Sequence, residues 1–133
     1  MAALYLASRA PCHAGARLYS GARAIAGYAT GNAGQALTLD RLCAWHSRFF
    51  PDDDFPLLER VRVGELRGHE PMQVVSGRLD RPIVHFQAPP RADLEPAVEE
   101  FLQWFERSRS DSGLDPWLRA GIAHFWFITL HPF

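Results

Sequence analysis

The sequence predicts a mainly α domain, a helical bundle with an inserted β-hairpin. Apolar residues recur at helical spacing after Asp93. A second, almost wholly apolar segment follows an aspartate-proline pair that begins at Asp115, which is a strong helix start. Two short runs rich in β-branched residues, 72–76 and 83–87, lie before these helical segments and predict a pair of strands.

Length and composition bound the class of protein. The 133 residues suit one domain with a single core, and 47% are hydrophobic and 22% charged. A net charge of −1 gives no strong field for nucleic acid or anionic lipid, and we expect neither partner. All 14 basic residues are arginines, which excludes lysine-dependent chemistry. No apolar run is long enough to span a membrane, and two cysteines without a CxxC pattern favour the cytoplasm.

The first half of the chain is expected to begin loosely. Residues 1–15 show no periodicity and contain helix breakers, so we treat 16–133 as the domain. A helix is predicted over about 16–30, with Gly31 as the residue that ends it. A second helix is predicted over about 39–50, with Thr38 as its N-cap.

The second half predicts the hairpin and two longer helices. The hairpin covers about 72–87, with the six residues 77–82 as its turn. A helix follows over about 94–107, capped by Asp93. The last helix covers about 116–130 and has almost no polar face, so we expect it to be the central, buried helix.

His131 is the first candidate functional residue. It ends the last helix, and Pro132 prevents the helix from continuing. We expect the proline to fix the direction of the imidazole, which would then act as a general base on a hydroxyl. A helix-capping histidine is the alternative. His124 lies on the same face two turns earlier, and we interpret it as a core residue.

Two further sites were weighed. Cys43 and His46 share a helix face, and with Cys12 and His13 they provide four residues of the types that bind zinc. Because adjacent residues rarely both bind one ion, we predict no metal site. The first strand of the hairpin, Met72-Gln73-Val74-Val75-Ser76, has an edge that an extended peptide can join, although it can also be a simple cover for the core.

Several segments together resemble the Fic (Fido) family. Residues 123–133, which end in His-Pro-Phe, resemble the central helix and the first half of the family signature HPFxxGNGRxxR. Residues 37–46 resemble the helix that opens many family domains. Residues 63–67, 72–77 and 84–90 resemble the region of the target-docking flap. The resemblance covers about three-quarters of the chain.

The resemblance implies a protein adenylyltransferase, which transfers AMP from ATP to a hydroxyl side chain of a target protein. His131 then corresponds to the base that deprotonates the target Ser, Thr or Tyr. The strand from Met72 to Ser76 corresponds to the target-docking flap, which holds the target segment by edge pairing. ATP with Mg²⁺ is the implied cofactor, and the partner is a protein segment.

The chain departs from the pattern after Phe133. The acidic residue for Mg²⁺, the glycine-rich anion loop and the arginines on the phosphates have no counterpart here. Positioning and charge stabilisation supply most of the catalysis in phosphoryl-type transfers. We therefore expect a C-terminally truncated fragment that binds no nucleotide and is inactive. Open alternatives are AMP removal or another phosphoryl-type transfer, a non-catalytic peptide-binding module, and a decayed reading frame.

Overall fold

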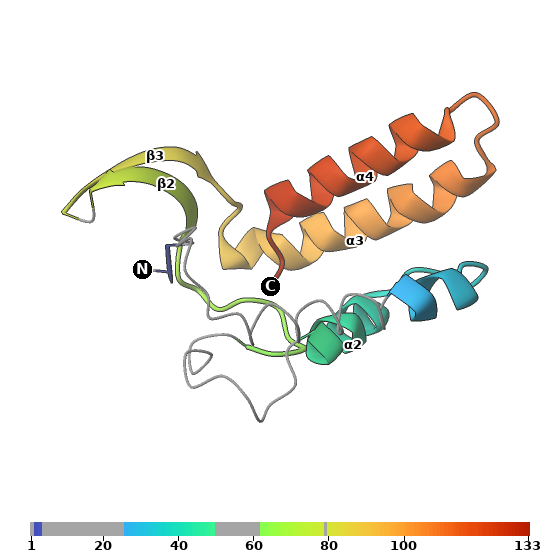
Figure 1. Ribbon diagram of the computed structural model, residues 1–133, viewed down its shortest axis with the longest axis horizontal. Helices are drawn as coiled ribbons and strands as arrows, with labels where there is room; N and C mark the ends of the chain where they lie inside the picture. The colour runs from blue at the N-terminus through green and yellow to red at the C-terminus, as the bar shows by residue number, and fades with distance from the viewer. Residues whose placement is uncertain (1, 4–25, 50–61, 79) are drawn as a thin grey trace. The chain divides into compact units, whose positions relative to one another are not determined.

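The computed structural model describes residues 2–3, 26–49, 62–78 and 80–133 (Figure 1). Its elements are β1 (Ala2–Ala3), α2 (Leu39–Phe49), β2 (Met72–Arg78), β3 (Arg81–Gln87), α3 (Arg91–Arg107), the 3₁₀ turn η2 (Ser108–Ser110) and α4 (Pro116–Leu130). Residues 26–31 are also helical. The expected class, mainly α with a β-hairpin, is confirmed.

The chain divides into two compact units, which are described separately. The first unit comprises residues 1–6 and 67–132, and the second comprises 7–66 together with Phe133. The first unit contains the hairpin, α3 and α4. The second contains α2 and the loop around Gly64. No helix within the described ranges has both the length and the apolar character needed to cross a membrane.

α3 and α4 form an antiparallel helical pair in the first unit (Figure 1). The predicted stripe of α3 is its buried face, which comprises Leu94, Val98, Phe101 and Leu102. Phe101 meets the rings of Trp126 and Phe127 on α4 at centroid distances of 5.8 and 5.9 Å. Aromatic contacts of this kind form the core between the two helices.

The start of α3 differs from the prediction. The helix begins at Arg91, and its N-cap is Pro90, whose backbone is extended and which makes no side-chain cap. Asp93 was expected to cap the helix but lies within the first turn, where its N–H donates to the carbonyl of Pro90 at 3.0 Å. Its carboxylate still lies at the positive end of the helix dipole.

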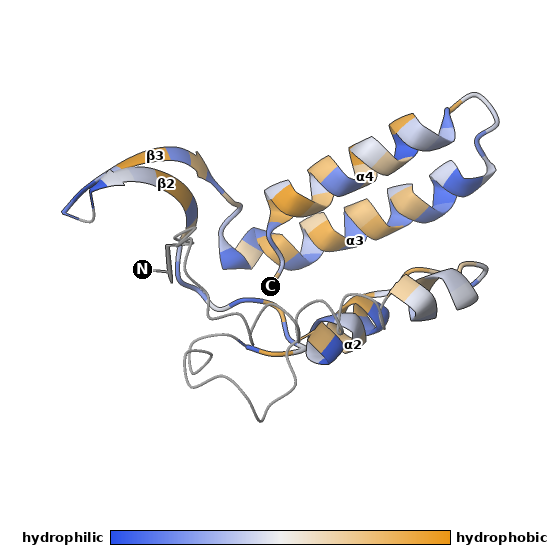
Figure 2. Ribbon diagram, in the orientation of Figure 1, coloured by the Kyte–Doolittle hydropathy of each residue, from blue (hydrophilic) through white to orange (hydrophobic). Residues whose placement is uncertain are grey.

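α4 begins as predicted but is not buried. Oδ1 of Asp115 accepts from the N–H groups of Trp117 and Leu118 at 2.9 and 3.1 Å, and Pro116 is the first helical residue. Leu130 is the one buried residue of this helix, while Trp117 is 86% and Phe125 66% exposed. Figure 2 shows hydrophobic residues along α4, whereas packing against α3 covers only one side of it. The predicted central, buried helix is therefore wrong.

The hairpin strands are longer than predicted. β2 and β3 are antiparallel, and the register pairs Gly77 with Pro82 and Arg78 with Arg81. The expected six-residue turn over 77–82 is therefore wrong, because the strands continue through most of it. Gly77 has a φ of +92°, which lets the strand twist sharply before the turn. β1 pairs in parallel with β2 at Met72 and Gln73, giving the sheet order β1-β2-β3.

In the second unit, α2 has the predicted N-cap. Oγ1 of Thr38 accepts from the N–H of Arg41 at 3.3 Å. The guanidinium of Arg41 donates to the carbonyls of Gln35 and Ala36 at 2.9 and 2.7 Å and so closes the preceding turn. Of the helix predicted over 16–30, residues 16–25 lie outside the described part. Gly31 is itself helical, so the prediction that it ends the helix from outside is wrong.

Candidate functional site

His131 has an unusual backbone conformation at the end of α4. Its φ of 47° and ψ of 62° place it in the left-handed region, and it is the C-cap of the helix. Among the described residues it is the only one other than glycine with a positive φ. A residue with a Cβ pays about 1–2 kcal/mol for this conformation. Something in the surrounding structure must therefore hold His131 in place.

Pro132 alone does not explain this conformation. A residue that precedes proline is pushed toward extended backbone angles by the proline ring. His131 instead adopts left-handed angles. The prediction that Pro132 aims the imidazole is therefore incomplete, since its local effect favours a different conformation. Pro132 still ends the helix because it has no N–H to donate.

Arg67 supplies the contacts that hold this segment. Its Nε donates to the carbonyl oxygen of His131 at 2.7 Å. Its own backbone N–H donates to the carbonyl oxygen of Pro132 at 2.8 Å. A terminal nitrogen of the same guanidinium donates to the carbonyl of Pro89. One residue thus binds the end of α4 and the segment that leads into α3.

The position of Arg67 follows from the antiparallel helices. The start of α3 and the end of α4 lie at the same end of the pair (Figure 1). Arg67 is 7% exposed, and burial lowers the pKa of its guanidinium, with a smaller contribution from the nearby charge of Arg91. An arginine remains charged at neutral pH even so. Its partners in the described part of the chain are carbonyl oxygens, which offset the cost of burying the charge.

The histidines of α4 differ in their surroundings. His131 is partly buried, and no group among the described residues hydrogen-bonds its imidazole. His124 is exposed, so its interpretation as a core residue is wrong.

The candidate docking strand is part of a bulged ladder. Gln73 pairs with Gln87 and Val74 with Phe86, and the register shifts between Val74 and Val75. Two polar pairs cross the hairpin: Gln73 donates to Gln87 at 2.9 Å, and Ser76 contacts Nε2 of His85 at 2.6 Å. Met72 and Val75 are partly buried, while Val74 is 50% exposed. The geometry makes this a solvent-exposed ribbon that keeps its own internal pairing.

The outward-facing donors of β2 can be assigned from the ladder. The N–H of Ala88 donates to the carbonyl of Met72 at 2.9 Å, so the backbone polar groups of Met72 face β3. Donor direction alternates along an antiparallel strand. The N–H groups of Val74 and Ser76 then also face β3, and those of Gln73 and Val75 face away. β1 occupies the outer side at Met72 and Gln73, which leaves Val75 beyond it.

The described residues offer no preformed metal site. No three His, Cys, Asp or Glu side chains in this part of the chain come together to hold a metal ion. Cys43 is one of the candidate zinc ligands. Burial and the nearby Asp40 and Glu65 raise the pKa of its thiol, which disfavours a thiolate. Cys12 and His13 lie outside the described residues.

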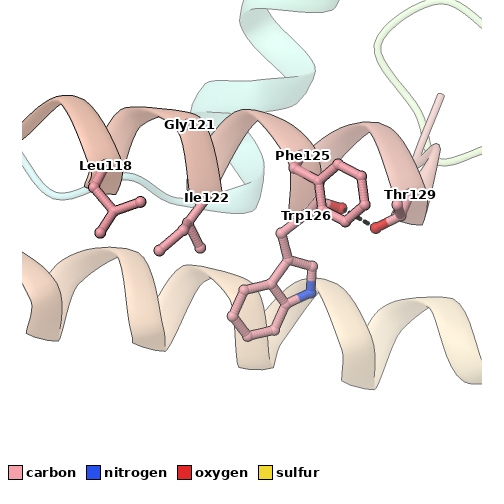
Figure 3. Close-up of a pocket in the computed structure, with 6 residues that line it drawn as sticks. All are labelled: Leu118, Gly121, Ile122, Phe125, Trp126 and Thr129. Atoms are coloured by element: carbon pink, nitrogen blue, oxygen red, sulfur yellow. Dashed lines mark hydrogen bonds between the residues drawn. The ribbon is translucent and has the colours of Figure 1, made fainter.

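A hollow on α4 is also unsuited to phosphates. It is an open apolar depression of about 500 Å³ along the helix (Figure 3). Its lining comprises Leu118, Gly121, Ile122, Phe125, Trp126 and Thr129. Thr129 is its only hydroxyl, and that group already donates to the carbonyl of Trp126 at 2.8 Å. The hollow contains no charged group to neutralise a nucleotide.

Sequence reasoning missed Arg67. Segment 63–67 contributes to the family resemblance as a whole, and nothing in the sequence assigns a role to its arginine. The contact that matters joins positions 64 residues apart, and no spacing rule connects them. The sequence offers no clear signal, because Arg67 is one of several charged residues in the segment before the strand that begins at Met72.

The fold and site define a class: a helical domain in which a histidine, fixed at the end of an apolar helix, accompanies an exposed β-ribbon. Residues 36–133 match the family model described as Fic/DOC family. This match covers well over half of the chain, and the protein therefore belongs to the Fic/DOC family. A search of curated proteins found no match to the chain. Members of this family generally transfer AMP from ATP with Mg²⁺ and act on protein targets.

Proposed function

We propose that this chain carries the base and the target-binding ribbon of a protein AMP transferase. In this proposal His131 takes the proton of a Ser, Thr or Tyr hydroxyl on a target protein as that oxygen attacks the α-phosphorus of ATP, the bond to the β-phosphate breaks and pyrophosphate leaves. Family membership supports the reaction class. The observation that carries the residue assignment is the held, left-handed backbone of His131, whose imidazole has no hydrogen-bond partner among the described residues.

The target segment is proposed to lie along β2. Its hydroxyl-bearing residue would be held in an extended conformation by backbone pairing with Met72-Gln73-Val74-Val75-Ser76. The outward N–H of Val75 supports this placement, since it lies beyond the two positions that β1 pairs. Edge pairing depends on backbone hydrogen bonds more than on side chains, so it suits targets of differing sequence. We place this activity in the cytoplasm, in keeping with two cysteines that form no disulfide framework.

The nucleotide is the part of the reaction that these residues do not accommodate. The described residues bring together no cluster of metal ligands, and the apolar hollow on α4 has no charged group in its lining. The glycine-rich anion motif is likewise absent from the 133 residues. We therefore propose that these residues alone transfer no AMP.

The test uses ATP labelled at the α-phosphate, Mg²⁺ and a mixed protein lysate. The chain and its His131→Ala variant are compared for label joined to protein. We expect both to give background. Label above the His131→Ala level would support AMP transfer and overturn the proposed inactivity.

A chimera tests the reaction class itself. The chain is continued after Phe133 by the anion loop and following helix of an active family member. We expect transfer that depends on His131. A folded chimera that binds ATP but labels nothing would overturn the assignment of His131 as base.

A non-catalytic peptide-binding module is the second candidate. The exposure of the ribbon favours it, because Val74, Ile83 and Val84 are each about half exposed. This function predicts peptide binding that persists when His131 is changed to Ala. It is separated from the first function by the chimera, which would then bind peptide without labelling it.

A further inference from the structure

We propose that Arg67 is the positioning residue for His131: its side chain, through the carbonyl of His131, fixes the backbone from which the imidazole projects. The proposal deepens the proposed function, since the direction of the ring matters only if His131 acts on a bound hydroxyl. Arg67 does not touch a substrate in this proposal. It acts entirely through the backbone of His131.

The hydrogen bonds of His131 fix both of its backbone angles. Its N–H donates to the carbonyl of Phe127 at 3.1 Å, which ties it to the last turn of α4. Its carbonyl accepts from Nε of Arg67 at 2.7 Å. With the N–H and the C=O both held, only the two side-chain torsions remain free. The Cα–Cβ bond, and with it the origin of the imidazole, therefore has one direction.

The peptide that follows is held by the same residue. The carbonyl of Pro132 accepts from the backbone N–H of Arg67 at 2.8 Å. Two consecutive carbonyls thus bind one arginine, one to its side chain and one to its main chain. A rotation of the His131–Pro132 peptide toward the extended angles that proline favours would break the side-chain bond. Arg67 therefore opposes the local preference of the sequence.

The guanidinium suits this role better than an ammonium. Its rigid planar fork presents donors in fixed directions, and here Nε and a terminal nitrogen contact the carbonyls of His131 and Pro89. Pro89 lies directly before the N-cap of α3, so the guanidinium is anchored next to the start of a helix. Arg67 is 7% exposed, and water does not replace these donors readily. A lysine has a single charged nitrogen and cannot reproduce the fork.

The test reads His131 directly by NMR on the ¹³C,¹⁵N-labelled chain. The variants are Arg67→Gln and Arg67→Lys, and both keep the backbone N–H that binds Pro132. Arg119→Gln is the matched control, because Arg119 is also a partly buried arginine that donates to a backbone carbonyl, that of Phe105 at 2.6 Å. We expect both Arg67 variants to move the Cα and carbonyl resonances of His131 away from left-handed values. Arg119→Gln should leave them in place.

A purely structural role gives a different pattern. Arg67→Gln and Arg119→Gln would then both lower the urea midpoint while the His131 resonances stay at their wild-type positions. That result overturns the proposal. If the Arg67 variants do not fold, the wild-type chain decides: a scalar coupling across the hydrogen bond between Nε of Arg67 and the carbonyl of His131 is expected, and its absence overturns the proposal.

These readouts do not involve ATP. Failure of AMP transfer in the chimera would contradict the proposed function without affecting the NMR result. Unmoved His131 resonances would sink the positioning role and leave the transfer assay untouched.

Discussion

Arg67 and His131 lie 64 positions apart in the sequence, yet Nε of one donates to the backbone carbonyl of the other at 2.7 Å. The residue proposed to carry the chemistry is therefore held by a distant part of the chain. Its own neighbours favour other angles, because a Cβ and a following proline both disfavour the observed conformation. At the end of α4, a residue that favours stability and a residue that could act as a base are therefore not the same.

Replacing His131 with Gly should give a more stable chain than replacing it with Ala. Both variants remove the imidazole, but only glycine adopts φ of 47° without a Cβ penalty. We expect the Gly variant to exceed the Ala variant in free energy of unfolding by about 1 kcal/mol. Urea denaturation of the two variants measures this difference. Equal midpoints would mean that His131 is not left-handed in solution.

Gly64 should tolerate no side chain. It has a φ of +75°, and a Cβ at this position would clash with Oγ of Ser47. That hydroxyl is held by a bond to the carbonyl of Cys43 at 3.1 Å. We expect Gly64→Ala to cost about 1–3 kcal/mol in the free energy of unfolding.

Two further variants test the reason for this cost. Gly34→Ala is the control, since nothing lies within 4 Å of a Cβ there. Adding Ser47→Ala to Gly64→Ala should recover part of the loss, because it removes the clashing oxygen but leaves the positive φ. Full recovery would show that the backbone angle costs nothing, and no recovery would show that the clash is absent.

Local signals in the sequence predicted the starts of two helices correctly. Thr38 and the Asp115-Pro116 pair act within one turn of their own positions, so no tertiary knowledge is needed. The spacing of Leu94, Val98, Phe101 and Leu102 likewise identified the buried face of α3. These features depend on helix geometry alone.

The wrong predictions concern features that depend on tertiary contacts. The apolar composition of α4 predicted burial, but burial depends on what packs against a helix, and Trp117 and Phe125 are exposed. Asp93 was a reasonable cap, yet the N-cap of α3 is Pro90, three residues earlier. The candidate base was found from its place before Pro132, whereas the arginine that holds it was not. A long-range hydrogen bond has no periodicity to read.

The second unit should lose stability as the pH falls through the titration of His46. Nδ1 of this residue accepts from the N–H of Gly64 at 3.0 Å, and its ring stacks on Phe133 at 4.4 Å. Burial lowers the pKa of His46 below its ordinary value of 6.5. Below pH 6.5 the unfolded chain therefore binds more protons at this position than the folded chain does. Stability is complete above that pH and declines below it.

Comparison with His46→Gln isolates this contribution. Gln has an oxygen that can accept from Gly64 but does not titrate, and the other histidines are common to both proteins. We expect the wild-type free energy of unfolding to fall more steeply than that of the variant between pH 6.5 and 5. Urea midpoints across this range measure the two slopes. Parallel profiles would show that His46 does not titrate differently in the folded chain.

Peptide binding to the ribbon should depend on Val75 and not on its side chain. The N–H of Val75 faces away from β3, and β1 pairs only with Met72 and Gln73 on that side in the described part of the chain. Proline at position 75 removes this outward donor without touching the inward bonds of the ladder. Losing one backbone bond of about 1 kcal/mol weakens binding about fivefold.

The measurement is fluorescence anisotropy with decapeptides that contain one central Ser, Thr or Tyr between β-branched residues. Val75→Thr is the matched control, because it keeps the N–H and suits a strand, and it should bind like the wild type. Val74→Pro is expected to act differently: its N–H faces β3, so the substitution should disrupt the hairpin itself and broaden its NMR signals. Equal affinity of the Val75→Pro and Val75→Thr chains would exclude edge pairing at β2 and move the target-binding surface elsewhere.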